Sequence, residues 1–367
     1  MKITDLTVTL FHWKRPRPRG QRPSAFDGDR QMGLVTVRTD QGVVGHSFLG
    51  GPRQGADELV GPLIRLLKPI VVGRNPLDIG AIWADCWKHN RLYNARAICA
   101  VDVALWDIAG KVAGLPVHRL LGTTRYSVPA YASSSYIATP AGYAEEAVSF
   151  LEQGWTAYKT HPHGVPGEDI AIVTAMRKAV GDRMVLMLDS MWAYDYEGAL
   201  KVGRAAEELD YRWYEDPLAE DDIYNYVKLK QYLRIPILAT EYAPGGLYGM
   251  SEWIRQRATD MIRGDVAVKG GITPMVKMCH LAEAFRMKCE IHHGGNSINN
   301  LANLHVTMAV PNCDFFEVLL PHRDNKFALL EEIEVDGKGL VHAPEKPGLG
   351  AEIDFDLIKK GTIQVLG

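Results

Sequence analysis

The sequence lacks the features that would indicate a membrane, secreted or nucleic-acid-binding protein. It contains no run of about 18 apolar residues, the length that crosses a bilayer as a helix. Residues 1–14 alternate apolar and polar side chains and lack the apolar core and cleavage site of a secretory signal. The formal net charge is -3 at pH 7, so no overall basic field attracts nucleic acid or anionic lipid. We therefore expect a cytoplasmic protein that binds neither.

Paired cysteines are also missing. The chain has no C-x-x-C motif. Its five cysteines are scattered along the sequence at Cys86, Cys99, Cys279, Cys289 and Cys313. This pattern argues against a disulfide framework, a zinc ribbon or a dithiol redox site. We interpret the cysteines as free thiols in a reducing compartment.

What is present is an ordinary globular composition, with 47% hydrophobic and 23% charged residues among 367. This length exceeds the size at which one hydrophobic core stops growing, so we expect two domains or a barrel with an attachment. The first 50 residues alternate like a small antiparallel sheet. Residues 14–22 interrupt it with prolines and five basic side chains. This segment is either a solvated basic loop or a lid that meets an anionic substrate.

From about residue 128, short apolar strands that end in polar residues alternate with amphipathic helices. Eight such strands are predicted, at residues 128–131, 157–161, 184–189, 211–215, 235–241, 261–265, 287–293 and 314–317. No G-x-G-x-x-G follows the first strand, which argues against a doubly wound open sheet. The pattern predicts an α/β fold of the closed parallel (β/α)8-barrel type.

Barrel enzymes carry their chemistry at the carboxyl ends of the strands. Three carboxylates, Asp189, Glu215 and Glu241, end successive predicted strands at equal intervals of 26 residues. Such carboxylates repel one another in a half-buried site unless a cation neutralises them. Oxygen-only ligands favour Mg²⁺, with Mn²⁺ as the alternative, over zinc. We therefore predict that these three residues bind a divalent metal ion.

A basic pair precedes the carboxylates. Lys159 and His161 are one residue apart on a predicted strand, so both should point into the barrel mouth. A lysine near a dication should have a lowered pKa and would then serve as a base. The sequence does not decide which of the two removes a proton.

An acid or base is also predicted on the side of the substrate opposite Lys159 and His161. Asp265 and His293 end the next two strands, and the carboxylate would fix the imidazole tautomer. Strand alternation sends only one of His292 and His293 inward, and we assign His293, with His292 as the alternative. Glu317 ends the last strand and, if protonated, would donate a hydrogen bond to an enolate.

These motifs resemble the enolase superfamily, specifically its mandelate racemase branch, over nearly the whole chain. The resemblance rests on the helix before the barrel, two metal-ligand strands, an aspartate segment and a histidine segment. In that order they are residues 100–122, 213–217, 239–241, 265–273 and 293–295. One departure concerns the base, because the K-x-K common in this family reads Lys159-Thr-His161 here.

The resemblance implies an architecture. Residues 1–122 would form an α+β capping domain, residues 123–324 the barrel, and residues 325–367 a C-terminal segment packed on the cap. The resemblance also implies symmetric homo-oligomers and a lid that closes over the substrate. The expected substrate-binding residues are two lid arginines and three aromatic residues, Arg19, Arg22, Trp192, Tyr194 and Tyr242.

The expected function is Mg²⁺-dependent dehydration of a sugar acid, an aldonate or aldarate, to a 2-keto-3-deoxy acid. Lys159 or His161 would take the proton next to the carboxylate, and His293 would protonate the departing β-hydroxyl. Two alternatives stay open. A racemase or epimerase of an α-hydroxy acid would use the same two bases, and a non-catalytic barrel would only bind a metal or sugar acid. The sequence does not identify the substrate.

Overall fold

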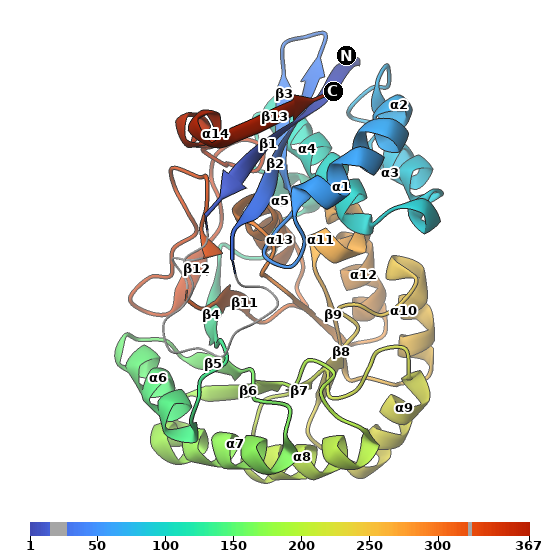
Figure 1. The fold of residues 1–367 in the computed structure, drawn as a ribbon. Helices are drawn as coiled ribbons and strands as arrows, with labels where there is room; N and C mark the ends of the chain where they lie inside the picture. Colours follow the sequence, from blue (N-terminus) through green and yellow to red (C-terminus); the bar gives the residue numbers. More distant parts are fainter. Residues whose placement is uncertain (15–27, 322–324) are drawn as a thin grey trace.

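The computed structural model describes residues 1–14, 28–321 and 325–367, and it has an antiparallel sheet at one end and a barrel at the other (Figure 1). The sheet has the order β13-β1-β2-β3. Its strands are β1 (Ile3–Trp13), β2 (Arg30–Thr39), β3 (Val44–Leu49) and β13 (Thr362–Leu366). Strands β1 and β2 pair in antiparallel register, with Val8 opposite Val35, and both side chains are fully buried. The alternation in the sequence therefore does correspond to one buried face.

Helices cover the buried face of this sheet and connect it to the barrel. They are α1 (Ala56–Pro62), a π-helix (Leu63–Leu67), α2 (Lys68–Val71), α3 (Ile79–Trp87), α4 (Ala95–Ala113) and α5 (Val117–Leu121). The α4 helix is apolar on most sides because it packs on β3 of the cap and also on α11 of the barrel. It begins after Asn94, whose side chain accepts from the Arg96 N–H, and ends at Gly114 in the left-handed conformation.

Eight parallel strands form the barrel, as predicted from the sequence. They are β4 (Ser127–Ser133), β5 (Ala157–Thr160), β6 (Val185–Asp189), β7 (Tyr214–Glu215), β8 (Ile237–Ala239), β9 (Met261–Gly264), β10 (Lys288–Ile291) and β11 (Phe316–Leu319). The order runs from β10 back to β4 and then to β11, and β4 pairs with β11 in parallel. The first and last barrel strands are therefore neighbours, as in a (β/α)8 barrel.

The helices that follow the strands lie around the outside of the barrel (Figure 1). They are α6 (Pro140–Glu152), α7 (Pro166–Val180), α8 (Tyr196–Glu208), α9 (Ile223–Tyr232), α10 (Gly246–Arg255), α11 (Val266–Lys269), α12 (Ile272–Ala284) and α13 (Ser297–Ala309). No helix in the described ranges combines the length and apolarity needed to cross a membrane.

The C-terminal segment contacts both parts of the molecule. β12 (Leu340–His342) pairs with β4 of the barrel, whereas α14 (Phe355–Gly361) leads into β13, which pairs with β1 of the cap. Asp107 on α4 accepts hydrogen bonds from the backbone N–H groups of His46 and Leu349. The carboxyl ends of the barrel strands face the cap, and this is where the candidate site lies (Figure 1).

Candidate active site

The strand tips bring the predicted metal ligands and the β5 lysine together inside the barrel. The Lys159 Nζ lies 3.1 Å from Asp189 Oδ2, 3.1 Å from Glu215 Oε1 and 2.7 Å from Glu317 Oε1. Its side chain is completely buried, so these carboxylates are its counterions. Lys159 thus contacts two of the three predicted metal ligands, Asp189 and Glu215, whereas Glu241 does not pair with it.

A second buried cation, Arg263 on β9, was not among the predicted site residues. Its Nε lies 2.6 Å from Glu215 Oε1 and 3.6 Å from Glu241 Oε2, and one terminal nitrogen lies 2.5 Å from Glu317 Oε2. Arg263 precedes Asp265 by two residues, and period-two alternation puts both on the inner face of the strand. The two-residue spacing from Asp265 could therefore have identified Arg263 as a site residue from the sequence.

The charges of this buried cluster do not balance. Three full cations, Lys159, Arg263 and Arg53 of the cap, face four carboxylates, which are Asp189, Glu215, Glu241 and Glu317. Burial raises the pKa of Glu215 well above its ordinary value, and repulsion from Asp189 adds to this despite Arg263. A carboxylate driven toward its neutral form indicates that the cluster needs more positive charge.

A divalent cation fits this cluster by charge and by its all-oxygen donors. As the side chains stand, no three acidic, thiol or imidazole groups in the described part of the chain are placed to coordinate one metal ion. The reason is that Lys159 and Arg263 lie between the carboxylates. The donor chemistry therefore suits Mg²⁺, but the coordination geometry is not formed.

Lys159 is held in its charged form. Burial and Arg263 lower its pKa, but Glu215 and Glu317 outweigh them and hold the Lys159 pKa well above its ordinary value. The predicted lowering of the Lys159 pKa applies to a site that holds a dication and stays a prediction; without one, Glu317 at 2.7 Å is a strong counterion.

His161 differs from Lys159 in having one nitrogen directed at the cluster. Its Nδ1 donates to the backbone carbonyl of Ser134 at 2.7 Å, and its Nε2 lies 2.9 Å from Asp189 Oδ2. The Ser134 contact fixes the ring orientation. Because both partners are acceptors, both ring nitrogens donate in this arrangement, and Nε2, which faces the cluster, is the atom through which the ring could exchange a proton.

The predicted imidazole partner of Asp265 is wrong: His292, rather than His293, forms the dyad. His292 Nδ1 lies 2.8 Å from Asp265 Oδ2 and 3.6 Å from Glu241 Oε1. Asp265 also accepts from Asn303 Nδ2 at 3.0 Å. The cause is strand alternation, because Ile291 packs in the core between barrel and helices and its neighbour His292 points inward.

His293 lies on the other side of the strand. Its ring packs 3.9 Å from the Phe316 ring centre, and neither ring nitrogen has a hydrogen-bond partner among the described residues. Burial lowers the His293 pKa to about 3. A neutral, enclosed imidazole of this kind does not suit the acid role that the sequence assigned to it.

Glu317 also differs from its prediction as a protonated hydrogen-bond donor. Burial raises its pKa, but Lys159 and Arg263 outweigh this effect and hold the Glu317 pKa well below its ordinary value. The carboxylate is ionised and serves as a counterion for both cations.

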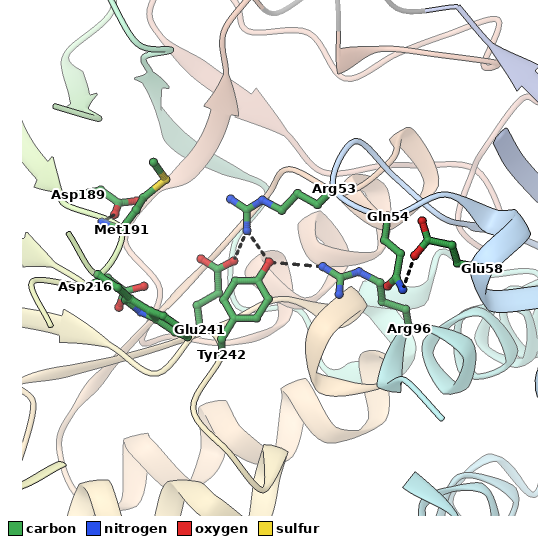
Figure 2. Close-up of a pocket in the computed structure, with 10 residues that line it drawn as sticks. Arg53, Gln54, Glu58, Arg96, Asp189, Met191, Asp216, Glu241 and Tyr242 are labelled. Carbon is green, nitrogen blue, oxygen red and sulfur yellow. Dashed lines mark hydrogen bonds and ion pairs between the residues drawn. The ribbon is translucent and has the colours of Figure 1, made fainter. Parts of the chain in front are cut away.

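A cavity of about 460 Å³ opens between the barrel mouth and the cap (Figure 2). Its lining residues are Arg53, Gln54, Glu58, Arg96, Asp189, Met191, Trp192, Asp216, Glu241 and Tyr242. Trp192 and Tyr242 thus lie where the sequence predicted substrate contacts. Tyr194 does not line this cavity, and its hydroxyl donates to Asp169 at 2.5 Å. Arg19 and Arg22 lie outside the described residues.

Two arginines of the cap reach the cavity, and neither was predicted. Arg53 follows β3, and its Nη1 lies 3.2 Å from Glu241 Oε1 and also contacts the Tyr242 hydroxyl (Figure 2). Arg96 is in the first turn of α4, with its Nη2 3.4 Å from the same hydroxyl. No periodicity singles out these residues, because their positions depend on how the cap packs on the barrel.

Two family models match the chain. Residues 7–122 match the mandelate racemase / muconate lactonizing enzyme N-terminal domain, and residues 142–357 match the enolase C-terminal domain-like family. The two matches together include most of the cap and nearly all of the barrel.

Solved and curated proteins similar to this chain include dehydratases and a cycloisomerase. A crystal structure of D-glucarate dehydratase from Agrobacterium tumefaciens complexed with magnesium superposes with a TM-score of 0.90 at 33% identity, covering 99% of this chain and 100% of that chain. Arabinonate dehydratase from Saccharolobus solfataricus is 30% identical over 86% of this chain and 87% of its own length. D-galactarolactone cycloisomerase from Agrobacterium fabrum is 27% identical over 98% of each chain.

Proposed function

The chain belongs to the mandelate racemase / muconate lactonizing enzyme family of the enolase superfamily, and from this membership we propose that it dehydrates a sugar acid to a 2-keto-3-deoxy acid. The observation that carries the proposal is a histidine on each side of one carboxylate cluster. His161 Nε2 lies 2.9 Å from Asp189, and His292 Nδ1 lies 3.6 Å from Glu241. The dehydratases among its relatives support the same reaction class.

We further propose that Asp189, Glu215 and Glu241 hold Mg²⁺, with Mn²⁺ as a substitute. Bound there, the ion would supply positive charge where the substrate carboxylate becomes more negative as its neighbouring C–H bond breaks. The buried negative charge of the cluster and its oxygen-only donors support this assignment.

The proton transfers belong to the two histidines. His161 would take the proton next to the carboxylate at Nε2 once Asp189 binds the metal ion and no longer accepts from this nitrogen, because Nδ1 donates to the Ser134 carbonyl and Lys159 is held as a cation. His292 donates a proton from Nε2 to the departing β-hydroxyl, because Asp265 holds its Nδ1. Breaking the C–H and C–O bonds releases water and leaves an enol, which becomes the 2-keto acid.

Binding and water exclusion fall to residues that line the cavity. Arg53 lies beside Glu241 and would bind the substrate carboxylate. Trp192 and Tyr242 form an edge-to-face pair with ring centres 6.1 Å apart, and they would cover the reacting carbons.

The test is a panel of aldonates and aldarates incubated with Mg²⁺ in D₂O. Release of a 2-keto acid with loss of water supports the proposal, and an H161N/H292N double variant controls for contaminating enzymes. Deuterium at the α-carbon without loss of water would replace dehydration by racemisation or epimerisation. Binding without either reaction would favour a non-catalytic barrel.

A further inference from the structure

The cavity carries opposite charges where the barrel and the cap meet. Asp189, Asp216 and Glu241 line it from the barrel, whereas Arg53 and Arg96 enter from the cap (Figure 2). A substrate in this cavity would therefore contact both the carboxylate cluster of the barrel and the arginines of the cap. Its volume, about 460 Å³, is within the range of small-molecule sites.

The two arginines have different surroundings. Arg53 lies 3.2 Å from Glu241 and belongs to the end where the reacting carboxylate would bind. Arg96 lies on the far side of Tyr242, whose hydroxyl is 3.4 Å from its Nη2 (Figure 2). Within the described ranges, no carboxylate forms an ion pair with the Arg96 guanidinium. A cation that faces a cavity with no counterion is suited to bind an anionic group of a ligand.

The position of Arg96 adds to this preference. It lies in the first turn of α4, a helix of 19 residues whose N-terminal N–H groups carry partial positive charge. Glu58 lines the same end and opposes an anion, but it is exposed and accepts a hydrogen bond from Gln54 Nε2 at 3.2 Å. Arg96 therefore remains the charged group there without an ionic partner among the described residues.

We propose that Arg96 binds a second carboxylate at the far end of the substrate, so that this enzyme prefers aldarates, which are diacids, to aldonates. The proposal rests on the proposed function. An aldarate places a carboxylate where the guanidinium can donate two parallel N–H bonds. An aldonate places a neutral hydroxyl there, which leaves the cation uncompensated. The resulting preference should be about 10- to 100-fold in kcat/KM, the usual value of one charge-assisted contact.

The experiment compares acid sugars that differ only at the far carbon, galactarate with D-galactonate and D-glucarate with D-gluconate. Turnover of each is measured with Mg²⁺ for the wild type and for R96Q. We expect KM for the diacid to rise about 10- to 100-fold in R96Q, with kcat changed less and the monoacid unaffected. R91Q, which removes an exposed cap arginine outside the cavity, should change neither. E58Q removes the opposing charge and should lower KM for the diacid.

Several outcomes would overturn the proposal. One is a wild type that uses aldonates as well as aldarates, and another is an R96Q variant that affects both members of a pair equally. If no acid sugar yields a 2-keto acid, the proposed dehydration fails, and calorimetric binding of the same pairs then tests Arg96 alone. Tighter binding of the diacid that is lost in R96Q would support the arginine's role, whereas equal binding would refute it.

Discussion

At the residue scale, the two basic side chains on β5 differ in their ability to exchange a proton. Lys159 is fully buried and paired with three carboxylates, so it serves to balance charge. His161 has only Asp189 at its Nε2. The K-T-H motif left this choice open in the sequence, and the difference in ion pairing now favours His161 as the base.

We therefore predict that H161N slows α-proton removal about 10²- to 10⁴-fold, the usual contribution of a general base. The measurement is deuterium exchange at the α-carbon, followed by NMR alongside 2-keto acid formation. H163N is the matched control, because His163 lies on the same loop but bonds Glu168 and the Ile137 carbonyl. Equal exchange in H161N and wild type would refute the assignment.

The adjacent histidines after β10 give a second residue-scale prediction. H292N should reduce dehydration by about 10²-fold or more, because the proton donor to the leaving hydroxyl is lost. H293N should retain most of the activity, because its imidazole is neutral at ordinary pH and packs on Phe316. Steady-state kinetics of both variants at pH 7 provide the comparison. A larger loss in H293N than in H292N would contradict it.

The predicted metal ligands share one property: each lies at or just after the end of a strand whose direction the apolar pattern determines. They are Asp189, Glu215 and Glu241. The choice between His292 and His293 depended on which side of β10 faces the helices, and Ile291 in the outer core decides it. Arg263 could have been found by alternation from Asp265. Arg96 could not, because only packing of the cap brings it to the cavity.

At the scale of elements, helix α4 of the cap domain supplies a hydrogen-bond acceptor for the N-terminus of barrel helix α12. The α12 helix begins after Gly271, which has no side chain to satisfy its first N–H groups. Asp102 on α4 fills this role by accepting from the Thr273 N–H at 3.0 Å. A Cβ added at Gly271 would lie 2.2 Å from Asp102 Oδ2, and φ there is +123°. Asp102 can therefore reach the start of α12 only because residue 271 is a glycine.

This contact predicts a pH dependence of stability. Burial raises the Asp102 pKa to about 7, although the Thr273 hydrogen bonds oppose it. Between the ordinary value of 3.8 and about 7, the folded state binds a proton that the unfolded state lacks, so this group lowers stability as pH rises. D102N cannot titrate, so its stability relative to wild type should increase by roughly 2 to 3 kcal/mol from pH 5 to pH 8.

Thermal unfolding midpoints of D102N and wild type at pH 5 and pH 8 provide the measurement. D78N, which changes an exposed cap carboxylate, is the control and should follow the wild type. A constant difference between D102N and wild type at both pH values would contradict the raised pKa.

The sequence predicted the type of each barrel element more reliably than its first and last residues. All eight barrel strands are present, but β7 has only two residues, Tyr214–Glu215, where five were expected. The apolar run extends beyond the ladder because Trp213 fills the barrel interior without belonging to the strand. In the cap, α1 is followed directly by a π-helix that begins just after Pro62, and no side-chain pattern distinguishes the two. Side-chain patterns identify buried faces, whereas hydrogen-bond registers depend on neighbouring elements.

At the scale of the whole molecule, the proposed metal site would couple folding to cofactor binding. The barrel encloses four carboxylates and two full cations at its centre, with Arg53 reaching Glu241 from the cap. Folding therefore gathers net negative charge at the base of the cavity that Asp189 and Glu241 line. A dication that binds there and not to the unfolded chain should stabilise the fold by mass action, about 2.7 kcal/mol at 100 times its dissociation constant.

We predict that Mg²⁺ raises the thermal unfolding midpoint in a saturable way, and that EDTA reverses this shift and abolishes activity. NaCl at equal ionic strength should not reproduce the shift, because screening acts weakly on buried charges. E215Q should lose most of the Mg²⁺ effect, whereas E283Q, an exposed helix carboxylate, should retain it. Full activity in EDTA, or an equal Mg²⁺ shift in E215Q, would mean that the carboxylates serve only Lys159 and Arg263.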